Sequence, residues 1–109
     1  MFTVVLMDPQ LPDGYGPDDE VEHDSPDPVW LQLAAVLIAR IERGDYPVRR
    51  SIPSETQLMD EFGIARGTAR KSIRLLADRG YVQTVTGRGS YVMERHTEES
   101  PSAVRKQFE

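Results

Sequence analysis

The chain has 109 residues, a length that suits one small folded domain with flanking segments, and 39% of its residues are hydrophobic. It contains no cysteine, which excludes disulfide frameworks and thiolate zinc sites. Its first apolar run, Phe2–Met7, is too short for a signal peptide or a membrane span, so we expect a cytoplasmic protein.

The net charge of −5 hides an uneven distribution along the chain. Residues 1–28 hold eight acidic residues and no Lys or Arg, whereas residues 29–95 hold eleven basic and seven acidic residues. The average therefore conceals a mildly basic part attached to an acidic arm, and the basic part is suited to a polyanionic partner.

Two different segments make up the arm, residues 1–28. Phe2–Met7 favours β-structure, and it is either a fraying terminus or a strand that pairs with a sheet edge or with a second copy of itself. Residues 9–28 are rich in Pro, Gly and Asp and hold almost no core-forming residues, which predicts a disordered linker.

The next segment predicts a first helix. Asp27 suits an N-cap, Pro28 suits the first helical position, and Gly44 is expected to end the helix. Between them an apolar stripe with helical spacing predicts a core-facing side: Trp30, Leu33, Ala34, Leu37, Ile38 and Ile41. A loop follows over residues 45–53, in which Arg49 and Arg50 either reach phosphate or are solvated.

The stretch from residue 54 to 76 predicts two helices joined by a tight turn. Ser54 and Gln57 form a capping-box pair, Gly63 supplies the turn, and the third helix runs from about Ala65 to Arg79. The expected buried faces are Leu58, Met59 and Phe62 on one helix, and Ala69, Ile73, Leu76 and Ala77 on the other.

Two β-favouring runs then predict a hairpin, Tyr81–Val85 and Ser90–Met93, joined by residues 86–89. The expected fold class is α+β, a winged helix-turn-helix of three helices followed by a two-stranded wing. We expect this domain to span residues 29–93, with a polar tail at 94–109.

Basic residues line one side of the third helix. Because successive residues rotate by about 100°, Arg66, Arg70 and Arg74 form one row, with Gly67 and Lys71 beside it. No acidic residue of this helix lies among them, so pairing within the helix does not account for the row. A solvated face is the bland interpretation. After a capped helix and a glycine turn, the row favours binding of nucleic acid.

The residue types fit such a role. Arg offers a planar fork of donors that suits guanine edges and phosphates. Residues near the start of a recognition helix reach deepest, which selects Arg66, Gly67 and Arg70, with Thr68 near the DNA backbone. Gly67 either permits a close approach or is a tolerated weak position that costs about 1 kcal/mol in the helix.

The hairpin adds a second basic feature. Arg88 stands between Gly87 and Gly89, so a tight turn would present it at the tip, where an Arg can enter a narrow minor groove. The bland interpretation is an exposed Arg in an ordinary turn.

Catalysis has little support in the sequence. His23 lies in the expected linker and His96 in the tail, and we find no phosphate-binding Gly-rich loop and no cluster of metal ligands. We therefore expect a protein that is not an enzyme, with no catalytic residues, no cofactor and no metal.

Residues from about Val29 to Val92 resemble the winged-helix DNA-binding domain of GntR-type bacterial transcriptional regulators. The landmarks occur in order and at the family's spacing: Ile41-Glu42-Arg43-Gly44-Asp45-Tyr46, Ile52-Pro53-Ser54-Glu55, Leu58, Phe62-Gly63-Ile64-Ala65-Arg66, Thr68, Arg70, Leu75, Gly80-Tyr81-Val82 and Gly87-Arg88-Gly89-Ser90-Tyr91-Val92.

The resemblance implies a bacterial regulator, usually a repressor, that binds a palindromic operator in double-stranded DNA as a homodimer in the cytoplasm and on the nucleoid. In the family, positions matching Ser54, Arg66, Gly67, Thr68, Arg70 and Gly87 meet the DNA. With the basic residues identified above, the predicted DNA-binding set is Ser54, Thr56, Arg66, Gly67, Thr68, Arg70, Lys71, Arg74, Gly87, Arg88 and Gly89.

The chain departs from the family pattern at several positions. Thr56 stands where an Arg is common, and Ala65 stands where a Ser or Thr usually caps the third helix, a loss typically worth about 1 kcal/mol. Met59 and Ala69 replace a smaller and a larger apolar residue, which suggests a size swap across one helix contact.

The family's effector domain normally follows the wing, but only about 16 residues follow Met93. We therefore expect no metabolite pocket and no small-molecule effector, and Phe2–Met7 is the leading candidate for dimerisation. We further hypothesise that residues 1–28 compete with DNA for the basic face. The alternative function is a protein–protein interaction module or adaptor that uses the acidic arm.

Overall fold

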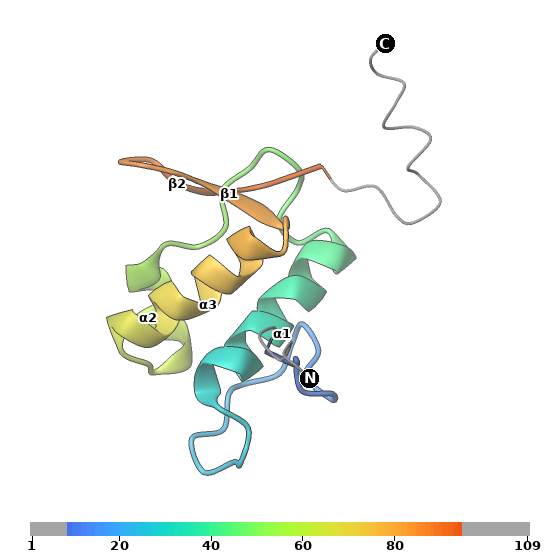
Figure 1. Cartoon of the computed structure of the whole chain (residues 1–109), viewed down its shortest axis with the longest axis vertical. Helices are drawn as coiled ribbons and strands as arrows, with labels where there is room; N and C mark the ends of the chain where they lie inside the picture. The colour runs from blue at the N-terminus through green and yellow to red at the C-terminus, as the bar shows by residue number, and fades with distance from the viewer. Residues whose placement is uncertain (1–8, 95–109) are drawn as a thin grey trace, which may run out of the picture.

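A computed structural model describes residues 9–94 of the chain as three helices followed by an antiparallel hairpin (Figure 1). The elements are α1 (Val29–Arg43), α2 (Glu55–Phe62), α3 (Arg66–Asp78), β1 (Val82–Val85) and β2 (Gly89–Val92). This confirms the predicted winged helix-turn-helix. None of the described helices is long and apolar enough to cross a membrane.

Local capping signals determine where α2 begins and ends. The Ser54 hydroxyl accepts a hydrogen bond from the Gln57 backbone N–H at 3.1 Å, and the Gln57 side chain accepts one from the Ser54 N–H at 2.8 Å. Gly63 ends the helix in the left-handed conformation, with φ of 66°. The first residue before α3, Ala65, makes no side-chain capping bond, so the expected weak start of α3 is confirmed.

The predicted start of α1 is wrong by one residue. Pro28 rather than Asp27 is the N-cap, and its carbonyl accepts from the N–H groups of Leu31 and Gln32. The Asp27 carboxylate instead accepts from the Tyr15 hydroxyl at 3.4 Å. Asp27 therefore holds the preceding segment in place, and no described side chain caps the N-terminal end of α1.

The core lies where α1, α2, α3 and the inner face of the hairpin meet. In addition to the predicted apolar stripes it buries residues that periodicity did not select, among them Val36, Leu75 and the polar Gln32 and Ser72. The Ser72 hydroxyl donates to the Trp30 carbonyl at 2.7 Å and so ties α3 to α1. Trp30, Ile41 and Ala77 are only partly buried against this core. The expectation that Met59 is buried is wrong, since it is only partly buried and does not belong to the core.

A segment expected to be loop extends the wing. β1 pairs with β2 from Val82↔Val92 to Val85↔Gly89, and the other edge of β2 pairs with residues 49–52. Ile52 N–H donates to the Ser90 carbonyl and Val92 N–H donates to the Arg50 carbonyl, both at 2.9 Å. This additional segment satisfies backbone groups of β2 that a two-stranded wing would leave unpaired. It also anchors the start of α2 to the wing.

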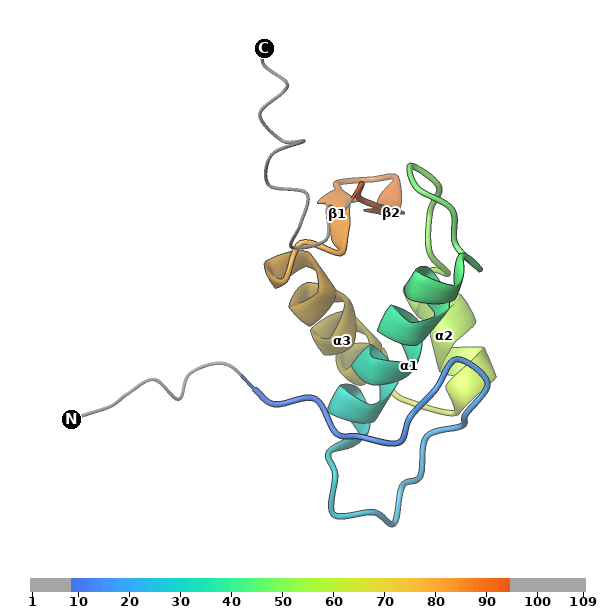
Figure 2. The same ribbon diagram turned by 90° about the vertical axis from the view of Figure 1, so that its right-hand side faces the viewer.

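Residues 9–28, named here the acidic strap, pack along α1 (Figure 2). The Gln32 side chain is fully buried and donates to the carbonyls of Glu22 and Asp27, at 3.0 and 2.7 Å, while it accepts from the Glu22 N–H at 2.7 Å. Val21 joins the core. The prediction of a disordered linker is therefore wrong, because α1 supplies partners for backbone groups of the strap.

Two arginines of α1 complete the attachment of the strap. The Arg40 Nε donates to the Pro17 carbonyl at 2.8 Å, and Arg43 pairs with Asp18 at 2.9 Å and with Asp45 at 2.6 Å. Most of the described part of the arm lies on α1, and its first residue reaches α3, where Arg79 donates to the Pro9 carbonyl and Pro9 lines a hollow with Lys71 and Arg74. The hypothesis that the arm competes with DNA stays untested. Phe2–Met7, the leading candidate for dimerisation, falls outside the described residues.

Candidate nucleic-acid interface

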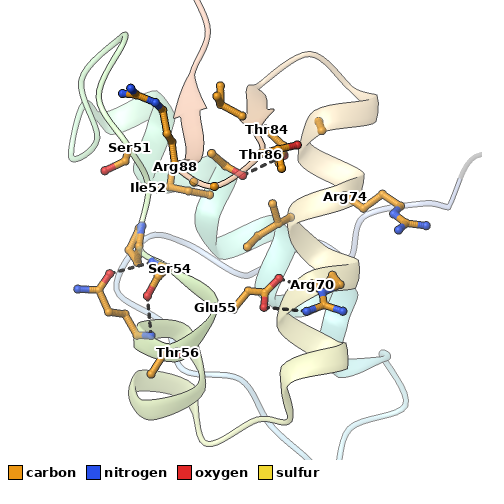
Figure 3. Close-up of a pocket in the computed structure, with 18 of the residues that line it drawn as sticks. Ser51, Ile52, Ser54, Glu55, Thr56, Arg70, Arg74, Thr84, Thr86 and Arg88 are labelled. Carbon is orange, nitrogen blue, oxygen red and sulfur yellow. Dashed lines mark hydrogen bonds and ion pairs between the residues drawn. The ribbon is translucent and has the colours of Figure 1, made fainter.

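A groove of about 680 Å³ lies between the start of α2, the exposed side of α3 and the wing (Figure 3). It brings together eight of the eleven predicted DNA-binding residues, namely Ser54, Thr56, Arg66, Arg70, Arg74, Gly87, Arg88 and Gly89. Gly67, Thr68 and Lys71 lie outside its lining. The strap contributes no residue to the lining.

Glu55 joins two arginines of the basic row. Its carboxylate accepts from Arg66 Nη1 at 3.1 Å and from Arg70 Nε and Nη2 at 3.0 and 3.2 Å. In Figure 3, Glu55 and Arg70 point toward each other from neighbouring helices. The expectation that no acid lies among the cations holds only within α3, because Glu55 reaches the row from α2.

These ion pairs favour the charged forms of Glu55 and Arg70. The hydrogen bond from Arg70, and then that from Arg66, holds the pKa of Glu55 below its usual range, and Glu55 in turn raises the pKa of Arg70. Both arginines are about half exposed, at 51% and 60%, so solvent screens the pairs. The three side chains together carry one net positive charge.

The remaining cations of the groove are open. Arg74 extends away from Glu55 on α3 and Arg88 extends from the wing (Figure 3), and within residues 9–94 neither has an ion pair or a side-chain hydrogen bond. Unpaired guanidinium groups on an exposed surface suit phosphate oxygens or base edges.

The three predicted residues outside the groove differ from one another. Lys71 places its ammonium 4.4 Å from the ring centroid of Trp30, a cation–π contact on the α1 side of α3. Thr68 is half-buried, and its carbonyl accepts from the Ser72 hydroxyl. Gly67 faces open space, since a Cβ added there would meet no atom within 4 Å, so internal packing does not require a glycine.

The groove also contains hydroxyl groups that sequence reasoning did not select. Ser51, Thr84, Thr86 and Ser90 line it, and the hydroxyls of Thr84 and Ser90 lie 3.0 Å apart. Ser and Thr hydroxyls are common donors to phosphate oxygens. The expected hairpin was the available signal for Thr84 and Ser90, because residues directly opposite each other in an antiparallel pair share a face.

Over residues 9–94 no three His, Asp or Glu side chains are grouped so that they would hold a metal ion.

The helix-turn-helix, the basic groove and the wing together define a winged-helix domain of the nucleic-acid-binding kind. The model of the bacterial regulatory proteins of the gntR family matches residues 31–92, and the chain belongs to this family. The proteins of this family are transcriptional regulators rather than enzymes.

Individual relatives agree with this assignment. HTH-type transcriptional regulator TreR of Bacillus subtilis (strain 168) is 37% identical over 66% of this chain and 30% of its own length. Repressor MngR of the mannosyl-D-glycerate transport/metabolism system of Escherichia coli (strain K12) is 33% identical over 62% of this chain and 28% of its own. The chain thus spans about a third of the length of the curated relatives that it matches.

A solved structure extends the similarity to the backbone. The DNA-binding domain of AraR in complex with operator ORE1 is 30% identical to this chain, with a TM-score of 0.61, over 68% of this chain and 93% of that domain. YtrA from Sulfolobus acidocaldarius, at 23% identity and a TM-score of 0.64, covers 81% of this chain and 75% of that chain and supports the fold alone.

Proposed function

We propose that this chain is a sequence-specific DNA-binding repressor that occupies a palindromic operator as a homodimer. The observation that carries the proposal is the groove, in which the exposed side of α3 and the wing present Arg66, Arg70, Arg74 and Arg88 together. The AraR domain, which has the same fold, is described in complex with operators, and several regulators with similar sequence are named repressors.

The groove and the three predicted residues of α3 beside it have separate roles in this proposal. The start of α3 enters the major groove, where Arg66 and Arg70 read base edges and Gly67 lets the backbone approach closely. Arg88, between Gly87 and Gly89, enters the adjacent minor groove. Ser54, Thr56, Thr68, Lys71 and Arg74 then contact the sugar–phosphate backbone and position the domain.

Two copies of the chain are part of the proposal because one domain offers little charge. Residues 29–95 carry only four more basic than acidic residues, and affinity for DNA that does not depend on sequence grows with each phosphate neutralised. Two domains on half-sites about 34 Å apart would double the contacts and impose two-fold symmetry on the operator. As a DNA-binding repressor, the protein would act in the cytoplasm, on the nucleoid.

Selection of bound sequences from random duplex DNA with the full chain tests the proposal. The expected result is an enriched palindrome, whose half-site spacing reports the geometry of the dimer. Enrichment of a single half-site would contradict binding as a homodimer. The absence of any enriched sequence would overturn the proposed function and return attention to a protein–protein interaction module, which the comparisons do not favour.

A further inference from the structure

We propose that Glu55 determines specificity by holding Arg66 and Arg70 in the orientation that reads bases and by lowering the attraction of the groove for arbitrary DNA. This inference rests on the proposed function and concerns a residue outside the predicted DNA-binding set. Its basis is the shared carboxylate, 3.1 Å from Arg66 Nη1 and 3.0 Å from Arg70 Nε.

The geometry leaves donors available for DNA. A guanidinium group carries five N–H donors, and Glu55 accepts from Nε and Nη2 of Arg70 and from Nη1 of Arg66. A further long contact of 3.4 Å joins Arg66 Nη2 to the Thr56 hydroxyl. Arg70 Nη1 and Arg66 Nε therefore remain unused by these contacts, and Glu55 can stay bound while the arginines contact a base.

Restricting the arginines favours base reading over phosphate binding. A bidentate contact with guanine requires a defined plane and direction of the guanidinium group. A phosphate contact imposes a weaker directional requirement and follows from charge. A carboxylate that fixes both side chains from a neighbouring helix therefore favours the directional interaction.

The negative charge of Glu55 also favours the operator over arbitrary DNA. Arg66 and Arg70 would bring two positive charges to the groove, and Glu55 cancels one of them. Non-specific affinity depends on the number of phosphates neutralised, with a salt slope of about 0.9 per phosphate. The carboxylate thus weakens binding to arbitrary DNA, while base contacts compensate for it at the operator.

The contribution of Glu55 to the stability of α2 has to be separated from its role in specificity. Glu55 is the first residue of α2, where a negative charge also interacts favourably with the helix dipole. Asp60 supplies a matched control, because it is an exposed acidic residue of the same helix that does not line the groove.

The test measures dissociation constants of Glu55→Gln, Glu55→Asp and Asp60→Asn for the selected operator and for a scrambled duplex over a series of salt concentrations. For Glu55→Gln we expect tighter binding to the scrambled duplex, a salt slope steeper by about 0.9 for each subunit, and an operator preference reduced about tenfold. Glu55→Asp keeps the charge but shortens the reach, so its preference should fall without the steeper slope. Asp60→Asn should keep the preference of the unmodified protein.

An operator preference of Glu55→Gln within twofold of Asp60→Asn would overturn the inference and leave the proposed function standing. If the unmodified protein shows no preference for any duplex, the proposed function fails first and the inference fails with it. An NMR measurement needs no variant: the Arg70 Nε–H should stay hydrogen-bonded in the operator complex, and its release there would contradict the positioning role.

Discussion

The strap side and the groove side of this small domain use arginine in opposite ways. On the strap side, Arg40 and Arg43 bind groups of the chain itself, including the Pro17 carbonyl, Asp18 and Glu61. On the groove side, Arg74 and Arg88 have no such partner within residues 9–94. Arg66 and Arg70 of the groove share Glu55 and still keep unused donors. Arginines thus occur on both sides, but those of the groove leave more donors for another molecule.

The degree of burial explains part of the difference. The Arg40 side chain is only 15% exposed, and it also bonds the Tyr46 hydroxyl at 2.9 Å and lies 5.3 Å from the centroid of the Phe62 ring. A buried guanidinium group needs partners for its donors, because an unsatisfied one costs free energy. The groove arginines are exposed, so water can satisfy the donors that Glu55 does not occupy. The contrast between the two sides is therefore a contrast between structural and ligand-directed charge.

Reversing the charge of a groove arginine should cause the largest loss of operator affinity and so tests the contrast between the two sides most directly. Arg66→Glu or Arg70→Glu should each weaken operator binding about 100-fold or more, because a bidentate base contact worth roughly 1–3 kcal/mol is replaced by repulsion of the phosphates. Arg43→Glu makes the same change of charge on the strap side and should leave operator affinity within a fewfold of the unmodified protein. Fluorescence anisotropy with a labelled operator measures all three. Equal losses in the three variants would mean that total charge, rather than the groove, governs binding.

The attachment of the strap is open to a separate test through Gln32. Gln32→Leu should lower the free energy of unfolding by about 2 kcal/mol, because the part-buried Glu22 N–H and the carbonyls of Glu22 and Asp27 lose their partner. Urea denaturation gives this value, and hydrogen exchange at the Glu22 amide should become faster. Gln83→Leu, at an exposed site of β1, is the control and should change stability little. Slow exchange at Glu22 in Gln32→Leu would show that other contacts hold the strap.

On the groove side, Gly67 separates the needs of folding from those of binding. Gly67→Ala should stabilise the fold by up to about 1 kcal/mol, since Ala favours a helix over Gly and the added Cβ meets no neighbour. The same methyl group should weaken operator binding if α3 approaches DNA closely at this point. Thermal unfolding and anisotropy on one sample compare the two effects. A variant that gains stability and keeps full affinity would show that Gly67 is only a tolerated weak position.

Local signals made most of the fold predictable from the sequence. The capping box of Ser54 and Gln57 and the turn at Gly63 depend on residues no more than a few positions apart, and all of them occur as expected. The helical spacing of Leu33, Leu37 and their neighbours indicated the core for the same reason. Most of the predicted site residues then came together, because their placement follows from the helix period and from the hairpin.

What could not be predicted depends on contacts between distant segments. Gln32 interrupts an apolar helix, and nothing nearby in the sequence shows that the strap will supply partners for its amide. Glu55 follows a capping residue and looks like an ordinary first-turn acid, whereas its partner Arg70 lies 15 residues further along. Composition therefore suggested disorder for the strap and an isolated cationic row for α3, and tertiary contacts changed both.

The pH dependence of stability gives the smallest expected effect and compares both sides once more. Arginine partners hold the pKa of Glu55 in the groove and of Asp18 on the strap below their usual ranges. A carboxyl whose pKa is lowered by folding adds stability above its unfolded pKa, about 4.3 for Glu and 3.9 for Asp, and this contribution is lost as the pH falls through the lowered value. Stability should thus be nearly level from about pH 5 to 7 and decline below about pH 4.

Urea denaturation of Glu55→Gln and Asp18→Asn, near neutral pH and again near pH 3, measures how the two sides share this decline. Each variant should be less stable than the unmodified protein at neutral pH and should converge with it in acid, where the native carboxyl is also protonated. The convergence should be larger for Glu55, which has two arginine partners and a side chain 27% exposed, than for Asp18, whose side chain is 81% exposed. A Glu55→Gln deficit that stays the same at both pH values would mean that the charge of Glu55 is not the source of the deficit, and that the ion pairs in the groove contribute nothing to folding.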